Sequence, residues 1–232
     1  MKWLTIFLAL VVSVSASAQT FTILHSFERH NGLEDGIFPY ASMTWDAAEN
    51  LYGTTVGDTY YNAGAVFKWS ASGEETVLYI FDNQTYHPDG VAPYGALILD
   101  AAGNLYGTTQ RGGNNCRLGG CGTVFKLDTS GTETLLYMFT GAADGYYPYA
   151  GLIMDSAGNL YGTASSGGLS QCPSGCGTLF RLDTNGDFTV LHNFTHPEGS
   201  HPPRRSSPRQ GWRLLWHHLG WRQVQSWGCV QV

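Results

Sequence analysis

The chain has 232 residues, of which 13% are charged, 13% are aromatic and 30 are glycine. This composition excludes an intrinsically disordered chain, which has few aromatics, and is typical of an all-β protein with many turns. The net charge is −6, yet the five Arg after Pro203 lie in a segment without Asp or Glu. The body before that segment is therefore strongly acidic, and we expect no nucleic-acid partner, because phosphate binding needs clustered Lys and Arg.

Residues 1–18 predict a secretory signal peptide. Lys2 precedes an apolar run, Trp3 to Val14, that is too short for a permanent membrane-spanning helix, and Ala16-Ser17-Ala18 has the small residues of a cleavage site. We expect a mature chain that begins at Gln19, has no transmembrane segment, and is secreted or held at the cell surface. In such an oxidising compartment, paired cysteines are candidates for disulfides.

Three short motifs repeat along residues 19–202. The sequence Asn-Leu-Tyr-Gly-Thr begins at Asn50, Asn104 and Asn159, so the unit is 54 or 55 residues long. Apolar strands that end in Phe recur as well, beginning with FTILHSF at residues 21–27, and a third motif reads GAVFKW, GTVFKLD or GTLFRLD. Each unit thus contains four short strand candidates, separated by turns rich in Asp and Gly.

Four short antiparallel strands in a unit of about this length indicate the blades of a β-propeller. We predict an all-β, propeller-like array with blades at about residues 37–81, 91–139 and 146–194, preceded by a leading strand at 21–27. Such a leading strand is typical of a ring that closes on itself. Closed propellers have at least four blades, so we expect these three to form an incomplete array with open sheet edges.

The motifs of the repeat unit resemble those of a known family. DG-x2-PYAGLI-x-D-x-AGNLYGT, followed by Gly-Gly, a Cys and GTVFKLD, resembles the GloVer-type repeat of bacterial "choice-of-anchor tandem repeat" proteins. The resemblance covers residues 21 to about 202. It implies an exported or surface-attached protein with a propeller-like fold, and it implies no catalytic residues. The first unit departs from the pattern, because it has Glu49 where the others have Gly103 and Gly158, and because it has no Cys pair.

The repeat is lost from about Pro203 onward, in a segment of five Arg and four Trp. If the codons are read one base later, every Trp codon becomes a codon that begins with GG and specifies Gly. Three of these shifted glycines fall on repeat glycines: Trp212, Trp216 and Trp221 lie 54 residues after Gly158, Gly162 and Gly167. We interpret residues 203–232 as an out-of-frame tail and expect it to be disordered. The alternative is a tail that binds membranes or nucleic acid through Trp and Arg.

Two cysteine pairs lie in corresponding loops of the second and third units: Cys116 with Cys121, and Cys172 with Cys176. In an exported chain these spacings predict two local disulfides that pin the loops. A pairing between blades or a four-cysteine zinc site stays open, although zinc sites prefer tighter Cys-x2-Cys pairs. We expect neither a metal nor another cofactor.

Asp46, Asp100 and Asp155 each precede the Asn-Leu-Tyr-Gly-Thr motif. Calcium loops place oxygen ligands at alternate positions, and alanines intervene here, so capping of the turn is favoured over calcium binding. The residues of the repeat motif that we single out are Asn50, Tyr52, Gly53, Asn104, Tyr106, Gly107, Asn159, Tyr161 and Gly162.

Tyr40, Tyr94 and Tyr149 follow a Pro in the loop that enters each blade. A rim of aromatics would bind sugars or peptides, whereas packing within the sheets is the simpler interpretation. Nearly every polar feature repeats, which favours architecture over catalysis. We therefore predict a binding or structural scaffold for an extracellular glycan or protein. The alternative is a fragment of an extracellular polysaccharide-acting enzyme whose active site lies in missing blades.

Overall fold

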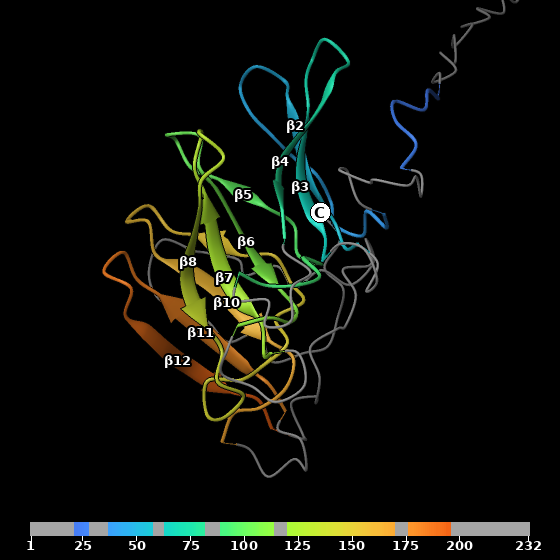
Figure 1. Ribbon diagram of the computed structural model, residues 1–232. Coiled ribbons are helices and arrows are strands. Elements are labelled where there is room, and N and C mark those ends of the chain that lie inside the picture. The colour runs from blue at the N-terminus through green and yellow to red at the C-terminus, as the bar shows by residue number, and fades with distance from the viewer. Residues whose placement is uncertain are drawn as a thin grey trace, which may run out of the picture.

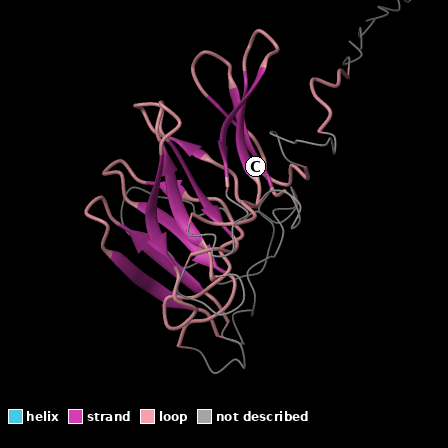
Figure 2. Ribbon diagram, in the orientation of Figure 1, coloured by secondary structure: helices cyan, strands magenta, loops and turns pink. Residues whose placement is uncertain are grey.

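The computed structural model describes residues 21–27, 37–57, 63–81, 89–113, 120–169 and 176–195. All regular secondary structure in these ranges is β-strand, arranged in three four-stranded antiparallel sheets (Figures 1 and 2). Within each sheet the strands pair in chain order, so each sheet is one repeat unit, and we call them blades 1, 2 and 3. The predicted fold class, an all-β array of four-stranded propeller-like blades, is confirmed.

The first strands of the blades are short, and the other three are of ordinary length. Blade 1 contains β1 (Thr44–Trp45), β2 (Leu51–Thr55), β3 (Ala65–Trp69) and β4 (Glu75–Ile80). Blade 2 contains β5 (Ile98–Leu99), β6 (Leu105–Thr109), β7 (Thr123–Leu127) and β8 (Glu133–Met138). Blade 3 contains β9 (Ile153–Met154), β10 (Leu160–Ala164), β11 (Thr178–Leu182) and β12 (Phe188–Asn193).

The fourth strand of each blade, β4, β8 or β12, pairs on one side alone, and we call it the outer strand. Each outer strand has one unpaired residue where its register shifts against the third strand: Leu78, Leu136 and Leu191. A bulge of this kind twists an open edge and hinders pairing with another strand. The three bulges are therefore a repeated device that protects the edge.

The hydrophobic core lies between blades, where the faces of neighbouring sheets pack together. One cluster joins blade 1 to blade 2 and a second joins blade 2 to blade 3. In each, the Phe that follows an outer strand packs edge-on against the central Phe of the next blade. Phe81 meets Phe125 at 5.1 Å between ring centroids, and Phe139 meets Phe180 at 5.2 Å. These four rings are buried, so they fix the spacing between blades.

Backbone contacts hold the same junctions. In the entry loops of blades 2 and 3, the residue before the Pro donates its N–H to the preceding blade. Ala92 donates to the Ala63 carbonyl at 2.7 Å, and Tyr147 donates to the Cys121 carbonyl at 2.9 Å. Ala92 and Tyr147 have φ of 60° and 59°, a conformation that costs free energy in residues other than glycine. Phe38, at the same place in the entry loop of blade 1, has φ of 63°, so this unusual backbone belongs to the entry loop of every blade.

The structure differs from the sequence predictions at the leading strand and at the first strand of blade 3. Residues 21–27 contact blade 1, but they belong to none of the three sheets, so the predicted leading strand does not pair as a strand. The first strand of blade 3 is two residues long, shorter than the predicted YAGLIMD. There a Cβ on Gly151 would lie 2.7 Å from the Ala96 carbonyl oxygen, so this stretch contacts blade 2 at close range. The predicted signal peptide and the tail at 203–232 lie outside the described residues.

Candidate binding site

The Asp that precedes each Asn-Leu-Tyr-Gly-Thr motif is fully occupied by hydrogen bonds. In blade 2, Asp100 Oδ1 accepts bonds from the backbone N–H groups of Ala102 and Asn104, both at 2.9 Å. Its Oδ2 accepts bonds from Asn104 Nδ2 at 2.7 Å and from the Tyr106 hydroxyl at 3.0 Å. Blades 1 and 3 repeat this network. The predicted role of these aspartates as turn caps is confirmed.

The pKa values of the network follow from its geometry. The side-chain hydrogen bond from Asn50 is the main cause that lowers the pKa of Asp46 to about 2. Burial, and then the hydrogen bond to Asp100, raises the pKa of Tyr106 to about 12. Across the physiological range the carboxylate therefore stays ionised and the phenol stays protonated. The network is a permanent structural element with no group poised for proton transfer.

The Gly of the repeat motif makes room for a ring. Gly107 pairs with Phe125 across β6 and β7, and a Cβ on Gly107 would lie 2.6 Å from the ring. Gly53 and Gly162 stand in the same relation to Phe67 and Phe180. Substitution by any larger residue would push the central Phe out of its position between blades. The repeat-motif residues thus act in architecture.

Two aspartates that precede a Gly in the entry loops, Asp89 and Asp144, each link two blades. Asp144, in the loop that enters blade 3, accepts a hydrogen bond from the hydroxyl of Tyr137 on β8 at 3.0 Å. Its carboxylate also accepts bonds from the Thr140 N–H and hydroxyl and from the Ala142 N–H. Asp89 likewise accepts a bond from Tyr79 on β4 at 2.8 Å. These aspartates therefore hold the entry loops against the preceding blade.

Tyr40, Tyr94 and Tyr149, for which the sequence left a rim and packing within the sheets as alternatives, come together in one row. The ring centroids of Tyr40 and Tyr94 are 5.3 Å apart, and those of Tyr94 and Tyr149 are 5.4 Å apart. Phe38 extends the row, 6.0 Å from Tyr40. Phe38 and Tyr40 are 52% and 42% exposed, whereas Tyr94 and Tyr149 are half-buried. We call these four residues the aromatic row; it crosses all three blades and presents a continuous aromatic surface.

Sequence reasoning missed one residue of this site, Gln110. Its Nε2 donates a 2.6 Å hydrogen bond to the Tyr149 hydroxyl, which joins blade 2 to the row in blade 3. Val56 and Ser165 occupy the corresponding positions after β2 and β10. Gln110 is therefore a buried polar residue that does not repeat. Its departure from the repeat was a signal in the sequence, but its contact with Tyr149 depends on how the blades pack.

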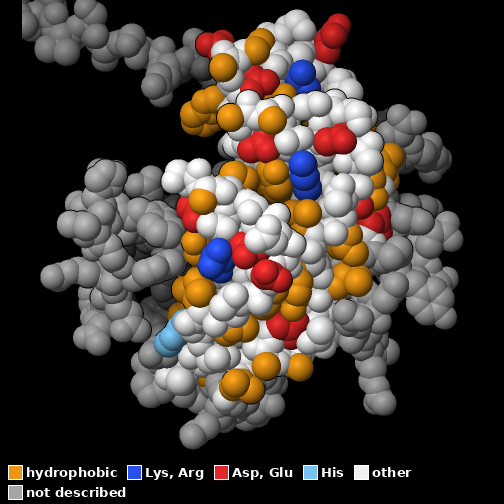
Figure 3. Space-filling view, turned by 90° about the vertical axis from the view of Figure 1, so that its left-hand side faces the viewer, with side chains coloured by type: hydrophobic (Ala, Val, Ile, Leu, Met, Phe, Trp, Pro, Cys, Tyr) orange, Lys and Arg blue, Asp and Glu red, His pale blue; other side chains and the backbone are white. Residues whose placement is uncertain are grey.

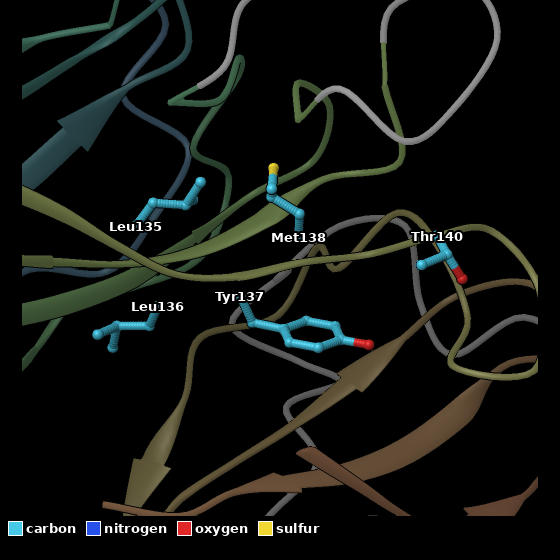
Figure 4. A pocket seen from close by; sticks show the side chains of 5 residues that line it. All are labelled: Leu135, Leu136, Tyr137, Met138 and Thr140. Carbon is cyan, nitrogen blue, oxygen red and sulfur yellow. The ribbon is translucent and has the colours of Figure 1, made fainter. Parts of the chain in front are cut away.

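A shallow, open hollow of about 370 Å³ lies beside β8. It is lined by Leu135, Leu136, Tyr137, Met138 and Thr140. Figure 4 shows Leu135 and Met138 on one side of the strand and Leu136 and Tyr137 on the other. The hollow therefore follows the open edge of the outer strand. Because the bulge at Leu136 lies in the middle of it, this edge is poorly suited to pairing with a peptide strand.

Charged groups and cysteines add no further cluster among the described residues. Within those ranges no group of three or more His, Cys, Asp or Glu could hold a metal, and no helix is long and apolar enough to cross a membrane. On the face drawn in Figure 3, the Lys and Arg side chains stand apart from one another. Cys121 and Cys176 are buried, while Cys116 and Cys172 lie outside the described residues, so the cysteine pairing stays a prediction.

The family model described as the Gloeobacter/Verrucomicrobia repeat matches residues 8–214. The chain belongs to this repeat family. This agrees with the tandem-repeat resemblance drawn from the motifs. No curated protein matches the chain.

Solved structures with similarity to this repeat protein include several enzymes and a surface component. A gluconolactonase from Xanthomonas campestris has 18% identity and a TM-score of 0.43 over 70% of this chain and 50% of its own. A luciferin-regenerating enzyme has 14% identity and a TM-score of 0.41, over 66% and 45%. PorZ, a surface component of the type-IX secretion system of Porphyromonas gingivalis, has 14% identity and a TM-score of 0.37, over 75% and 31%. The chain thus spans half or less of the length of each.

Proposed function

We propose that this repeat protein is an exported binding scaffold and that the aromatic row is its binding site, with an extracellular glycan as the ligand. The row carries the proposal, because it is the described feature in which equivalent residues of three blades meet at the surface instead of within a blade. Tyrosine offers an apolar ring for the C–H faces of a sugar and a hydroxyl for its polar edge. A chain of sugars would contact several rings at once, and a protein ligand is the competing outcome.

The test measures the affinity of the purified chain for a panel of soluble polysaccharides by gel-retardation electrophoresis. Tyr40→Ala is expected to weaken binding about fivefold, since a stacked ring contributes on the order of 1 kcal/mol. Phe21→Ala is the matched control, because Phe21 is an aromatic residue that is 88% exposed and outside the row. Equal loss in both variants, or no retardation by any polysaccharide, would contradict the proposal.

The same samples separate the scaffold from the enzyme alternative. Release of new reducing ends from a retained polysaccharide would show catalysis, which the scaffold does not perform. Retention without release supports the scaffold. If a protein from the same environment binds the chain, and Tyr40→Ala abolishes that binding, then the ligand is a protein and the aromatic row is still the binding site.

Export and disulfide formation are part of the same proposal. We infer cleavage before Gln19 and local disulfides Cys116–Cys121 and Cys172–Cys176. In support, Cys121 and Cys176 are buried, and the Cys121 carbonyl accepts a hydrogen bond from the Tyr147 N–H of the next blade. Mass spectrometry of peptides from the exported protein, digested without reduction, should show both linked pairs. Alkylated cysteines in those peptides would contradict the pairing.

A further inference from the structure

Residues 21–27 lie against blade 1 in the way that an outer strand lies against the following blade. The Phe27 ring meets Phe67 at 5.0 Å, edge to face. His25, two residues earlier, contacts the Trp69 ring at 5.6 Å, and its Nε2 lies 3.3 Å from Glu75 Oε2. The junctions between blades show the same edge-on pairs, Phe81 with Phe125 and Phe139 with Phe180. The segment therefore takes the place of an outer strand that precedes blade 1.

A second segment of the chain has nearly the same sequence. Residues 21–27 read FTILHSF and residues 188–194 read FTVLHNF, so five of the seven positions are identical. Residues 188–193 are β12, the outer strand of blade 3, and Phe194 follows it. The outer strand of blade 3 consequently has the His and the Phe with which residues 21–27 contact blade 1.

The two ends of the array are each less covered than the junctions inside it. At one end, Met43 is 38% exposed, whereas the corresponding Leu97 and Leu152 are 3% exposed behind a preceding blade. We call this end, with Met43, Trp45, Phe67 and Trp69, the front face. At the other end, Leu179 and Phe194 are half-buried, whereas the corresponding Val124 and Phe139 are fully buried. We call this end, with Ile153, Leu179 and Phe194, the back face.

We propose that the front face of blade 1 is a docking surface for the back face of blade 3 of a second copy of this chain, and that residues 21–27 cap it. The two faces are the two halves of one junction that the chain already forms twice, so the proposed contact continues an interface present in the structure. Two copies joined at both ends place six blades in one ring, within the range of closed propellers. The cap competes with β12 of the second copy for the ring of Phe67, and so weakens self-association.

The experiment is sedimentation velocity of the full chain over a wide range of concentration. Phe27→Ala removes the ring that contacts Phe67, and it should lower the dissociation constant of the dimer about tenfold, because the front face is uncovered in a larger fraction of molecules. Phe21→Ala is the matched control, since Phe21 lies in the same segment and is 88% exposed. It should leave the dissociation constant unchanged.

Two further variants keep the outcome decisive. His25→Ala removes the contacts with Trp69 and Glu75 and retains Phe27, so a smaller shift in the same direction is expected even if Phe27→Ala fails to fold. Adding Phe194→Ala to Phe27→Ala should reverse the gain, because Phe194 supplies the competing ring. If neither cap variant strengthens the dimer, the proposal is wrong. If the dimer of Phe27→Ala is unaffected by Phe194→Ala, the copies associate through another surface, and the proposed docking is wrong.

Discussion

The junction between blades 1 and 2 and the junction between blades 2 and 3 differ in the chemistry of the first residue of the outer strand of the following blade. In blade 3 this residue is Phe188, whose ring stacks on Tyr137 with centroids 3.9 Å apart and planes 9° apart. In blade 2 it is Glu133. Burial, and then the charge of Asp89, raises the pKa of Glu133 from 4.5 to about 7. One junction thus holds a stacked ring where the other holds a poorly solvated carboxyl group.

The difference shows which contacts set the geometry of a junction. Glu133 pairs with Leu127, and Phe188 pairs with Leu182, in the same register. A carboxyl group and a ring occupy this position without moving the strand, because the buried Phe pairs and the backbone hydrogen bonds are kept in both junctions. The first residue of the outer strand therefore leaves the architecture of a junction alone, and we expect it to change only the junction's stability.

The largest expected effect comes from removing a junction Phe. Phe139 is fully buried, and its ring lies within 5.7 Å of the rings of Tyr137, Phe180 and Phe188. Phe139→Ala should lower the free energy of unfolding by about 4 kcal/mol, through lost burial and a cavity that rigid neighbours cannot fill. Phe81→Ala, at the junction without Phe188, should cost about 3 kcal/mol. Urea denaturation followed by circular dichroism measures both, and a larger loss for Phe81→Ala would reverse the comparison.

The hydrogen bonds from Tyr79 to Asp89 and from Tyr137 to Asp144, by contrast, should contribute equally to the stability of the two junctions. Asp144→Ala removes the acceptor of bonds from Tyr137, Thr140 and Ala142, and should cost about 2 kcal/mol because it leaves these donors poorly paired. Tyr137→Phe and Tyr79→Phe each remove a single hydroxyl, and each should cost about 1 kcal/mol. The same urea titrations apply. If the two Tyr variants differ widely, the Tyr hydroxyl does not contribute equally at the two junctions.

Sequence alone predicted the features that lie within one repeat. Spacing located the strands, and the Asp before each Asn-Leu-Tyr-Gly-Thr motif was interpreted as a turn cap, because a turn is determined by residues close in sequence. Features that arise between repeats were harder to predict. The contact of Gln110 with Tyr149 and the spacing of the tyrosines in the aromatic row depend on how the blades pack. The burial of Glu133 could not be predicted from the sequence either, because Phe188 at the same position of blade 3 shows that the motif permits both residues.

The smallest expected effect comes from replacing the buried carboxyl group of Glu133. The pKa of Glu133 is higher in the folded chain than in the unfolded chain, so the folded state retains the proton between about pH 4.5 and 7. The unfolded chain releases it in that range, and the free energy of unfolding therefore falls as the pH rises. Glu133→Gln abolishes this dependence, and it should stabilise the protein by about 1 kcal/mol at pH 8 and leave it unchanged at pH 4, a modest figure because water screens the half-buried group.

Glu74→Gln is the matched control for this substitution, since Glu74 precedes β4 and its side chain is exposed. It removes the same charge from the acidic chain without altering a junction. Thermal unfolding of both variants at pH 4 and pH 8 separates the local effect of burial from the general effect of net charge. A gain shared by Glu74→Gln would assign the pH dependence to overall repulsion. A gain confined to Glu133→Gln would show that the junction between blades 1 and 2 is weakened by the carboxyl group that blade 3 replaces with Phe188.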